Sequence, residues 1–399
     1  MHRPRRTGAR LSNDGSDALR LVRDRATVLS YLQLGCWGYF LYGFGPTQPL
    51  LRGEQGVSLT VSGLHGTALA AGGLVAGFVT PAIVRRVGRG ALIWGGVAIV
   101  ALAAIVYTSS PAIGVTLTGA VLASFGGSMV VNGVPAVLAE LHGASGAAAV
   151  TEANALAAGL GIVAPLVIGA SVALGLGWRS GILVVVPFSV VLWLAMHSVR
   201  LPAPAALPPT SVGPDRLPGR YWLAWGLVSC CVSVEFCMNL WAGDVLRERA
   251  GMTSAASSAA LAAVVGGMTV GRVFGTRLAL RIASEKLMLG ALAVAAAGFA
   301  LFWFASGPVA AVAGLGLTGL GLALHYPIGV VIAVRESLGR PDRATARVGI
   351  GISLAVGLGP FGLGAIADRT STHTAFLLVP CLLAAATVLV LAVRRPTAA

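Results

Sequence analysis

Residues 200–220 read RLPAPAALPPTSVGPDRLPGR and interrupt a chain that is apolar for most of its length. Six of the chain's 20 prolines lie in this stretch, together with Asp215 and three arginines. Proline fixes φ and removes a backbone donor, and the charged side chains favour water, so we predict an extended, solvated linker. The linker divides the chain into two apolar parts of similar length, residues 26–199 and 221–393.

The composition of the chain excludes a soluble protein. Of its 399 residues, 56% are hydrophobic and 11% are charged, whereas an ordinary soluble domain has about 25% charged residues. A spanning helix needs roughly 20 apolar residues. Runs of about this length occur six times on each side of the linker: 26–51, 58–84, 91–107, 112–141, 148–174 and 180–199, then 221–245, 257–280, 288–305, 308–334, 348–367 and 374–393. We therefore predict an all-α membrane protein with twelve transmembrane helices in two six-helix bundles.

The arginines predict how the chain is oriented. The formal net charge is +14, and the basic residues lie mainly between the apolar runs. If the N-terminus is cytoplasmic, 22 of the 28 basic residues lie on the cytoplasmic side and five on the other. Cytoplasmic loops carry an excess of arginine and lysine, so we predict a multi-pass cell-membrane protein with cytoplasmic tails at residues 1–25 and 394–399. This placement argues against binding to nucleic acid.

The chain lacks the motifs of common enzymes and metal sites. Its five cysteines lie in apolar runs without a CxxC spacing, so neither a disulfide framework nor a zinc site is expected. The only lysine, Lys286, follows Glu285, which excludes a phosphate-binding loop, and no H-E-x-x-H occurs. We expect no cofactor, no bound metal and no enzymatic activity. A membrane-embedded enzyme or a sensor is kept as a distant alternative.

An internal repeat supports two matching halves. Three groups of residues recur at offsets of 194 to 196 positions: Gly72, Gly73 and Gly77 as Gly266, Gly267 and Gly271; Pro165 and Gly169 as Pro360 and Gly364; Glu140 and Gly143 as Glu336 and Gly339. One such match means little in a glycine-rich chain. Three that agree within two positions indicate duplicated, pseudo-symmetric halves.

Several motifs resemble the major facilitator superfamily of secondary transporters. Residues 81–89 read PAIVRRVGR, where this family usually has G-x-x-x-D-R-x-G-R. Further similar motifs are Gly271-Arg272-Val-Phe-Gly275-Thr-Arg277, Gly177-Trp178-Arg179 and Pro360-Phe361-x-x-Gly364. Val234-Glu235-Phe236 and Tyr326-Pro327 are similar to the fucose-permease-like branch.

The resemblance implies two bundles that rock about a central site, lined by the first, fourth, seventh and tenth runs. It also implies a cytoplasmic latch, whose candidates here are Arg86, Gly88, Arg89 and Arg272. For Arg272, substrate binding is the alternative. Pro81 and Arg85 depart from the family pattern. Pro81 replaces the usual glycine, and Arg85 stands where the family has an aspartate that helps to hold one conformation.

Glu235 is the leading functional candidate. It lies near the centre of the run 221–245, about 3 Å from the midplane at 1.5 Å rise per residue. An ionisable group at that depth costs roughly 2.5–3.5 kcal/mol on insertion scales, so it needs a reason to be there. A carboxyl group that is protonated in one conformation and ionised in another can couple transport to protons. Asn239 follows on the same helical face. The alternative is a neutral Glu235 that forms a packing hydrogen bond between helices.

A polar stripe in the fourth run supplies two further candidates. Ser124, Ser128 and Asn132 follow one another at four-residue spacing, which places them on one helical face. We take Ser128 and Asn132 as candidate substrate contacts. Hydrogen bonding between helices is the equally weighted alternative.

Aromatic and histidine side chains complete the candidate site. Tyr39 and Tyr42 in the first run could form an aromatic wall for a weakly polar ligand, or they could simply pack between helices. His325 in the tenth run could relay protons, or it could bond to a neighbour.

We expect a monomeric secondary active transporter that moves a small organic solute by alternating access, coupled to protons. Efflux of an amphipathic or drug-like compound is favoured because few fixed charges line the expected path. Proton-coupled uptake of a sugar-like polar solute is the main alternative, supported by the fucose-permease-like motifs.

Overall fold

The structure of the chain is a computed structural model, which describes residues 21–202, 216–279 and 281–394. Most of the predicted tails and linker, residues 1–20, 203–215 and 395–399, lies outside the described residues. Before the linker the helices are α1 (Arg25–Gln55), α2 (Leu59–Ser109), α3 (Ile113–His142), the short 3₁₀ helix η2 (Gly143–Ser145), α4 (Gly146–Ala173), α5 (Gly177–Leu183) and α6 (Val185–Met196). After it come α7 (Gly219–Glu248), α8 (Ser254–Ala260), α9 (Ala262–Ala279), α10 (Ser284–Phe304), α11 (Pro308–Leu322), α12 (His325–Glu336), α13 (Pro341–Ala367), α14 (Thr372–Ala375) and α15 (Leu378–Val393).

The predicted all-helical membrane fold is confirmed at this level. In the described part of the chain, ten helices are long and apolar enough to cross a membrane. α1 is not one of the ten, since its glutamines, tyrosines and prolines lower its hydropathy. The number twelve and the cytoplasmic termini stay predictions.

The helix α2 differs from the sequence expectation. The separate runs 58–84 and 91–107 form one continuous element whose only non-helical residue is Gly88, with φ 82° and ψ 168°. Glycine adopts this backbone conformation at little cost, whereas other residues are strained there. The arm before Gly88 runs parallel to α3, and the arm after it runs antiparallel to α3. Gly88 is therefore the turn of a tight helical hairpin.

The predicted run 308–334 is also divided. α11 ends at Leu322, and α12 begins at His325. Pro327 lies in the first turn of α12, where it removes a backbone donor that a continuous helix would need. Tyr326 therefore lies at the break between two helices.

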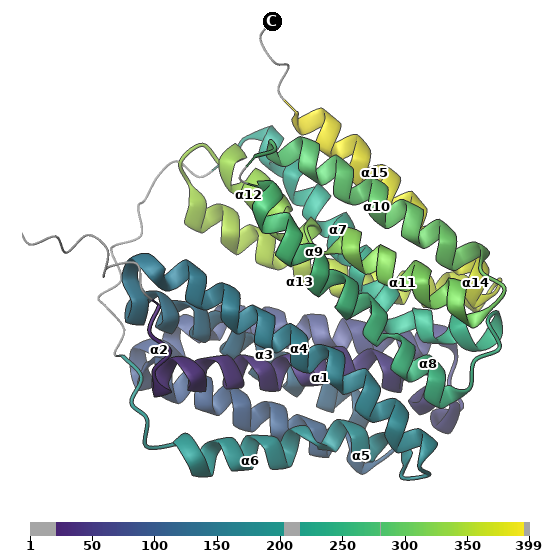
Figure 1. Cartoon of the computed structure of the whole chain (residues 1–399), viewed down its shortest axis with the longest axis horizontal. Coiled ribbons are helices and arrows are strands. Elements are labelled where there is room, and N and C mark those ends of the chain that lie inside the picture. Colours follow the sequence, from purple (N-terminus) through teal and green to yellow (C-terminus); the bar gives the residue numbers. More distant parts are fainter. Residues whose placement is uncertain (1–20, 203–215, 280, 395–399) are drawn as a thin grey trace, which may run out of the picture.

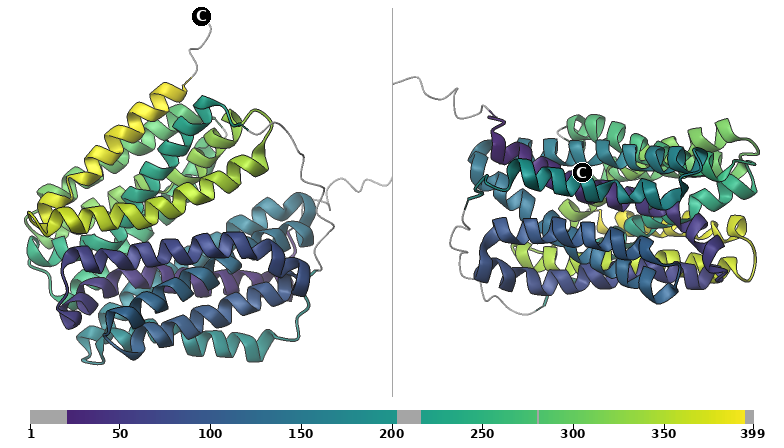
Figure 2. Two further views of the ribbon diagram at one scale, coloured as in Figure 1. Left: turned by 180° about the vertical axis from the view of Figure 1, so that it is seen from behind. Right: turned by 90° about the horizontal axis from the view of Figure 1, so that it is seen from below.

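The helices form two bundles that lie side by side (Figures 1 and 2). One bundle contains α1 to α6 and the other contains α7 to α15. They meet where α2 packs on α13 and where α4 packs on α8 and α9. We call the end at which α6 ends and α7 begins the linker end, and the opposite end the far end. In Figure 1 the bundles spread apart toward the linker end.

The two bundles repeat the same helix packing at a constant offset of 195 residues, so Gly72 corresponds to Gly267 and not to Gly266, with which the sequence match pairs it. Gly72 lies against Val121 and Phe125 of α3, and Gly267 lies against Gly316 and Leu320 of α11. Two further contacts match in the same way. Gly119 lies against Tyr107 as Gly314 lies against Phe302, and Gly126 lies against Gly96 as Gly321 lies against Ala291. At each of these glycines a Cβ atom would collide with the facing helix. The recurring glycines therefore set how closely the helices approach.

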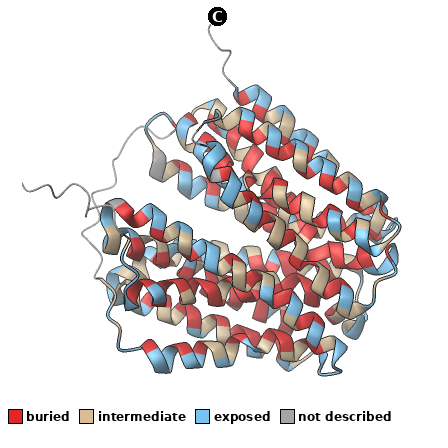
Figure 3. Cartoon of the chain, viewed as in Figure 1, coloured by how far each residue is buried: buried red, intermediate tan, exposed pale blue. Residues whose placement is uncertain are grey.

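The buried side chains are distributed in the same two bundles (Figure 3). Buried side chains fill the interior of each bundle and the zone where the bundles meet. Large apolar side chains are exposed on the outside, among them Phe78 (71%), Phe304 (74%) and Val309 (84%). An apolar exterior of this extent fits a protein whose surroundings are lipid.

Candidate functional site

A small cavity lies between the two bundles, and Glu235 lines it. α7 contributes Glu235 and Asn239, and α1 contributes Tyr42. The other walls are apolar: Leu41, Phe44, Leu69, Phe236 and Leu240. Only ≈ 10 Å³ is open to the centre of a water molecule, which is room for roughly one water. An organic solute needs more space than this conformation offers here.

Close approach of α1 and α7 creates this arrangement. Asn239 is one helical turn beyond Glu235, and its side-chain amide donates to the Glu235 backbone carbonyl at 3.0 Å. Gly45 lies against the backbone carbonyl of Asn239, with no room for a Cβ atom. Three of the predicted site residues, Glu235, Asn239 and Tyr42, therefore meet at one cavity.

Arg272 of α9 faces the same polar cluster. Its guanidinium interacts electrostatically with the Glu235 carboxylate and with the Tyr42 phenol. Tyr326, at the break between α11 and α12, is also within electrostatic range of Glu235, and it is 46% exposed. Arg272, a latch candidate with substrate binding as its alternative, thus lies within electrostatic range of Glu235.

Tyr39 and His325 lie elsewhere. The Tyr39 hydroxyl is buried and donates to the Gly181 carbonyl at 2.7 Å, inside the first bundle. His325 is 2% exposed, and neither ring nitrogen has a partner among the described residues. Gly321 and Gly329, one turn on either side of His325, pack against α10 and α7. His325 therefore faces the interior of the second bundle.

The polar stripe of α3 faces α2 over part of its length. A Cβ atom at Gly73 would lie 3.2 Å from the Ser124 hydroxyl and 3.4 Å from the Ser128 hydroxyl. Asn132, one turn further, is exposed. Ser128 and Asn132 thus have different surroundings despite their common face.

The predicted latch residues of the 81–89 motif lie at the linker end, within the first bundle. Arg89 forms an ion pair with Glu140 of α3. Gly88 forms the hairpin turn of α2, and Arg86 is exposed. Arg89 and Arg272 have different partners, so the four candidates do not form one cluster.

At the far end, an ion pair joins the two bundles. Arg52 of α1 and Asp244 of α7 form a bidentate pair, with 3.1 Å between Nη1 and Oδ2 for one of the two contacts. Asp244 is 2% exposed, and the Arg52 side chain is 17% exposed. The guanidinium also lies 5.7 Å from the ring centre of Trp241.

Asp368 forms a second connection between the bundles. It follows the last residue of α13, and it accepts hydrogen bonds from the backbone amides of Leu59 and Thr60, both at 2.8 Å, at the start of α2. The Thr60 hydroxyl donates to it as well, at 2.5 Å. Partial burial alone would raise the pKa of Asp368, but these hydrogen bonds outweigh it and lower the pKa. An aspartate of one bundle thus caps a helix of the other.

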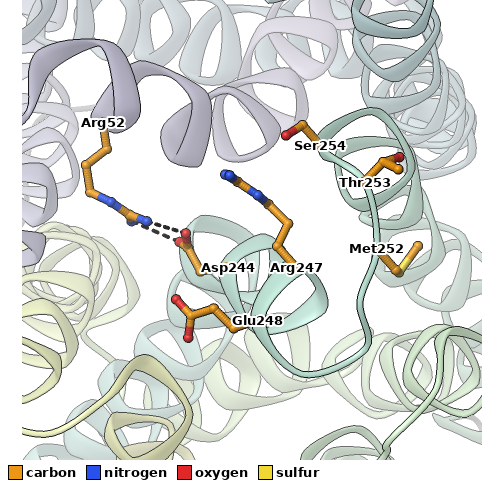
Figure 4. Close-up of a pocket in the computed structure, with 7 residues that line it drawn as sticks. All are labelled: Arg52, Asp244, Arg247, Glu248, Met252, Thr253 and Ser254. Carbon is orange, nitrogen blue, oxygen red and sulfur yellow. Dashed lines mark hydrogen bonds and ion pairs between the residues drawn. The ribbon is translucent and has the colours of Figure 1, made fainter.

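A larger cavity of ≈ 400 Å³ lies beside the Arg52–Asp244 pair. Figure 4 shows its lining, which includes Arg52, Asp244, Arg247, Glu248, Met252, Thr253 and Ser254. Its positive and negative side chains are equal in number.

The sequence carries a signal for the Arg52–Asp244 contact. Asp244 is an acidic residue near the end of the apolar run 221–245, and Arg52 directly follows the run 26–51. Nothing in the sequence pairs them, because the pairing depends on how the bundles face each other. Among the described residues, no group of three or more His, Cys, Asp and Glu side chains could hold a metal ion.

An all-helical chain with an apolar exterior, and with a charged cluster enclosed between two bundles, has the construction of a multi-pass membrane transporter. The chain belongs to the Major Facilitator Superfamily, because the profile of that family matches residues 26–336 and 234–399. The resemblance drawn from the sequence motifs is confirmed. No curated protein sequence matches the chain.

Solved structures share the fold. The E. coli fucose:proton symporter FucP matches with a TM-score of 0.60 and 18% identity, over 93% of this chain and 100% of that chain. The nucleoside transporter NupG matches with a TM-score of 0.74 and 14% identity, over 92% of this chain and 98% of that chain. A bacterial homologue of the human lysosomal transporter Spinster, inward-facing and occupied, matches with a TM-score of 0.66 and 17% identity, over 94% of this chain and 95% of that chain. At these identities the likeness concerns the fold.

Proposed function

We propose that the protein is a monomeric, proton-coupled secondary transporter of a small organic solute. The observation that carries this proposal is the Glu235 carboxyl group in a cavity between the two bundles. A carboxyl group there can exchange its proton with either side as the bundles rock. One structural neighbour is a fucose:proton symporter, which supports the same coupling.

The proposed topology has twelve spans and cytoplasmic termini. It counts α1 and each arm of the α2 hairpin as separate crossings, in addition to the other nine candidate spans. With the excess of arginine on the cytoplasmic side, the linker end is cytoplasmic. The contacts between the bundles at the far end then support a conformation that is closed toward the outside.

The surroundings of Glu235 favour a polar solute, and with it the alternative of proton-coupled uptake. Arg272, Tyr42 and Tyr326 supply charged or hydrogen-bonding groups around it, and an amphipathic compound would leave several of them unsatisfied. Efflux of an amphipathic compound is the second candidate, and the five apolar walls of the cavity favour it.

Reconstitution into liposomes tests the proposal. Under an imposed pH gradient, a panel of labelled neutral and acidic solutes is screened for accumulation. Glu235→Gln is expected to reduce gradient-driven accumulation at least tenfold while solute exchange without a gradient continues. Glu152→Gln is the matched control, because Glu152 pairs with Arg23 at the linker end, away from the cavity. Unchanged accumulation with Glu235→Gln would overturn the coupling role.

A further inference from the structure

Arg272 lies on the one face of α9 that points to the centre of the molecule. Gly267 and Gly271 pack on α11, and Gly275 packs on Leu324 just beyond it. A second face is exposed on the outside of the bundle, at Val270 (48%), Val273 (57%) and Phe274 (57%). Arg272 is on the third face, one turn beyond Met268, which is 1% exposed, and close in direction to Val265, which is 2% exposed. This direction agrees with its interactions with Glu235 and Tyr42.

We infer that Arg272 binds an anionic group of the transported solute, namely a carboxylate or a group of similar size and charge. The inference rests on the proposed function and names its class of solute. A guanidinium keeps its charge at every physiological pH, and its planar fork matches the two oxygens of a carboxylate. The Tyr42 hydroxyl, beside the guanidinium, is a further donor for such a group.

The charges around Arg272 explain why a proton and an anion would bind together. In the empty carrier the ionised Glu235 carboxylate lies within electrostatic range of Arg272 and balances its charge, although the two side chains form no direct ion pair. In the described part of the chain, the other titratable groups within range of Glu235 are Tyr42, Tyr326 and Cys231, which are ordinarily neutral near pH 7. When Glu235 takes up a proton, Arg272 loses its counter-ion in a poorly hydrated site. An anionic group of the solute replaces it.

This exchange leaves the total charge of the site unchanged. The empty site contains Arg272 and ionised Glu235, and the loaded site contains Arg272, protonated Glu235 and the anion. A site with only the proton or only the anion carries an uncompensated charge, which is costly in a low-dielectric interior. Coupling between proton and solute then follows from electrostatics, without a separate gate for each.

Matched pairs of solutes test the inference in the same proteoliposomes. The pairs are glucuronate against glucose, and succinate against succinamide. The acid is expected to accumulate at least tenfold more than its neutral partner in at least one pair. Its apparent affinity is expected to weaken up to about tenfold for each pH unit of increase between pH 6 and 8, because one proton binds with each anion. If neutral partners accumulate as well as the acids, the inference is overturned and the proposed function stands.

Two substitutions separate the roles of Arg272 and Glu235. Arg272→Gln is expected to abolish uptake of the acid, and Arg272→Lys is expected to retain part of it. Glu235→Gln, which imitates the protonated residue, is expected to bind the acid with an affinity that no longer depends on pH. Arg277→Gln, at an exposed position of the same helix, is the control and is expected to behave as the unchanged protein.

Thermal unfolding of each purified variant identifies those that fail to fold. Wild-type uptake of the acid by a folded Arg272→Gln variant overturns the inference. A Glu235→Gln variant that keeps full proton-driven accumulation overturns the proposed function. If no solute of any pair accumulates, both are overturned for these chemical classes.

Discussion

The two ends of the molecule use charged residues in different ways. At the far end, two contacts join the two bundles, since Arg52 pairs with Asp244 and Asp368 binds Leu59 and Thr60. A third contact at this end, the ion pair Arg179–Glu54, stays within the first bundle. At the linker end, the ion pairs between described residues stay within one bundle: Arg23–Glu152, Arg89–Glu140, Arg220–Glu336, Arg335–Glu285 and Arg335–Glu336. Contacts of the first kind must break if the far end opens, whereas those of the second kind can persist.

The linker-end pairs also repeat between the bundles, with the charges exchanged. In the first bundle Arg89, before the second arm of α2, pairs with Glu140 at the end of α3. In the second bundle Glu285, at the start of α10, pairs with Arg335 at the end of α12. Each pair ties two neighbouring helices of one bundle together, which fits bundles that move as rigid bodies.

Among substitutions that test the difference between the two ends, removal of Arg52 is expected to have the largest effect. Arg52→Ala leaves Asp244 buried without its partner, and breaking a buried pair in this way costs about 3–5 kcal/mol. The closed far end should therefore open in most molecules. Spin labels at Gly53 and Thr370, one in each bundle near this end, report the change as a longer distance by pulsed electron resonance.

The double variant Arg52→Gln with Asp244→Asn is the control for this prediction. It replaces the ion pair by two neutral side chains that can bond to each other, so it should recover part of the closed population. A Gly53–Thr370 distance that is the same in Arg52→Ala and in the unchanged protein would contradict the prediction.

Asp368→Asn is expected to have a smaller effect. The substitution removes the charge and one of the two oxygens that accept the amides at the start of α2, and complete loss of a helix cap costs about 0.5–2 kcal/mol, which is an upper limit here. The same pair of spin labels should show a partial shift toward the open far end. A shift larger than that of Arg52→Ala would contradict the proposed order.

Protonation of Asp368 at low pH should have the same effect on the far end as Asp368→Asn. The pKa of Asp368 is held below its ordinary value of 3.8. Its contribution is therefore complete above that value and is lost as the pH falls through the lowered pKa. Between pH 5 and 8 the Asp368 contact should not change. The Gly53–Thr370 spin-label distance, measured as a function of pH in the unchanged protein and in Asp368→Asn, tests this.

Breaking a pair at the linker end is expected to have the smallest effect. Arg89→Ala removes the partly exposed pair with Glu140, for which about 1 kcal/mol or less of stability is expected. The thermal unfolding temperature should fall slightly, and the far-end distance should stay the same. If Arg89→Ala opens or closes the far end, the pair acts between bundles after all, as the latch hypothesis requires.

The depth of a residue could be predicted from the sequence, but its direction could not. Glu235, Asn239 and Tyr42 meet at the central cavity because each lies near the middle of its run and faces the other bundle. Tyr39 and His325 have similar depths, yet they face the interior of their own bundles. Spacing gives the relative direction of two residues on one helix, but not the rotation of that helix toward its neighbours.

The sequence alone determined that this is a helical membrane protein with two matching parts, because hydropathy and repeats are properties of each segment by itself. The family resemblance also followed from local motifs. Only the tertiary structure brought Arg272 to Glu235 and joined Asp368 to the start of α2. These contacts depend on how two bundles, distant in sequence, rotate and meet, and no local pattern encodes that geometry.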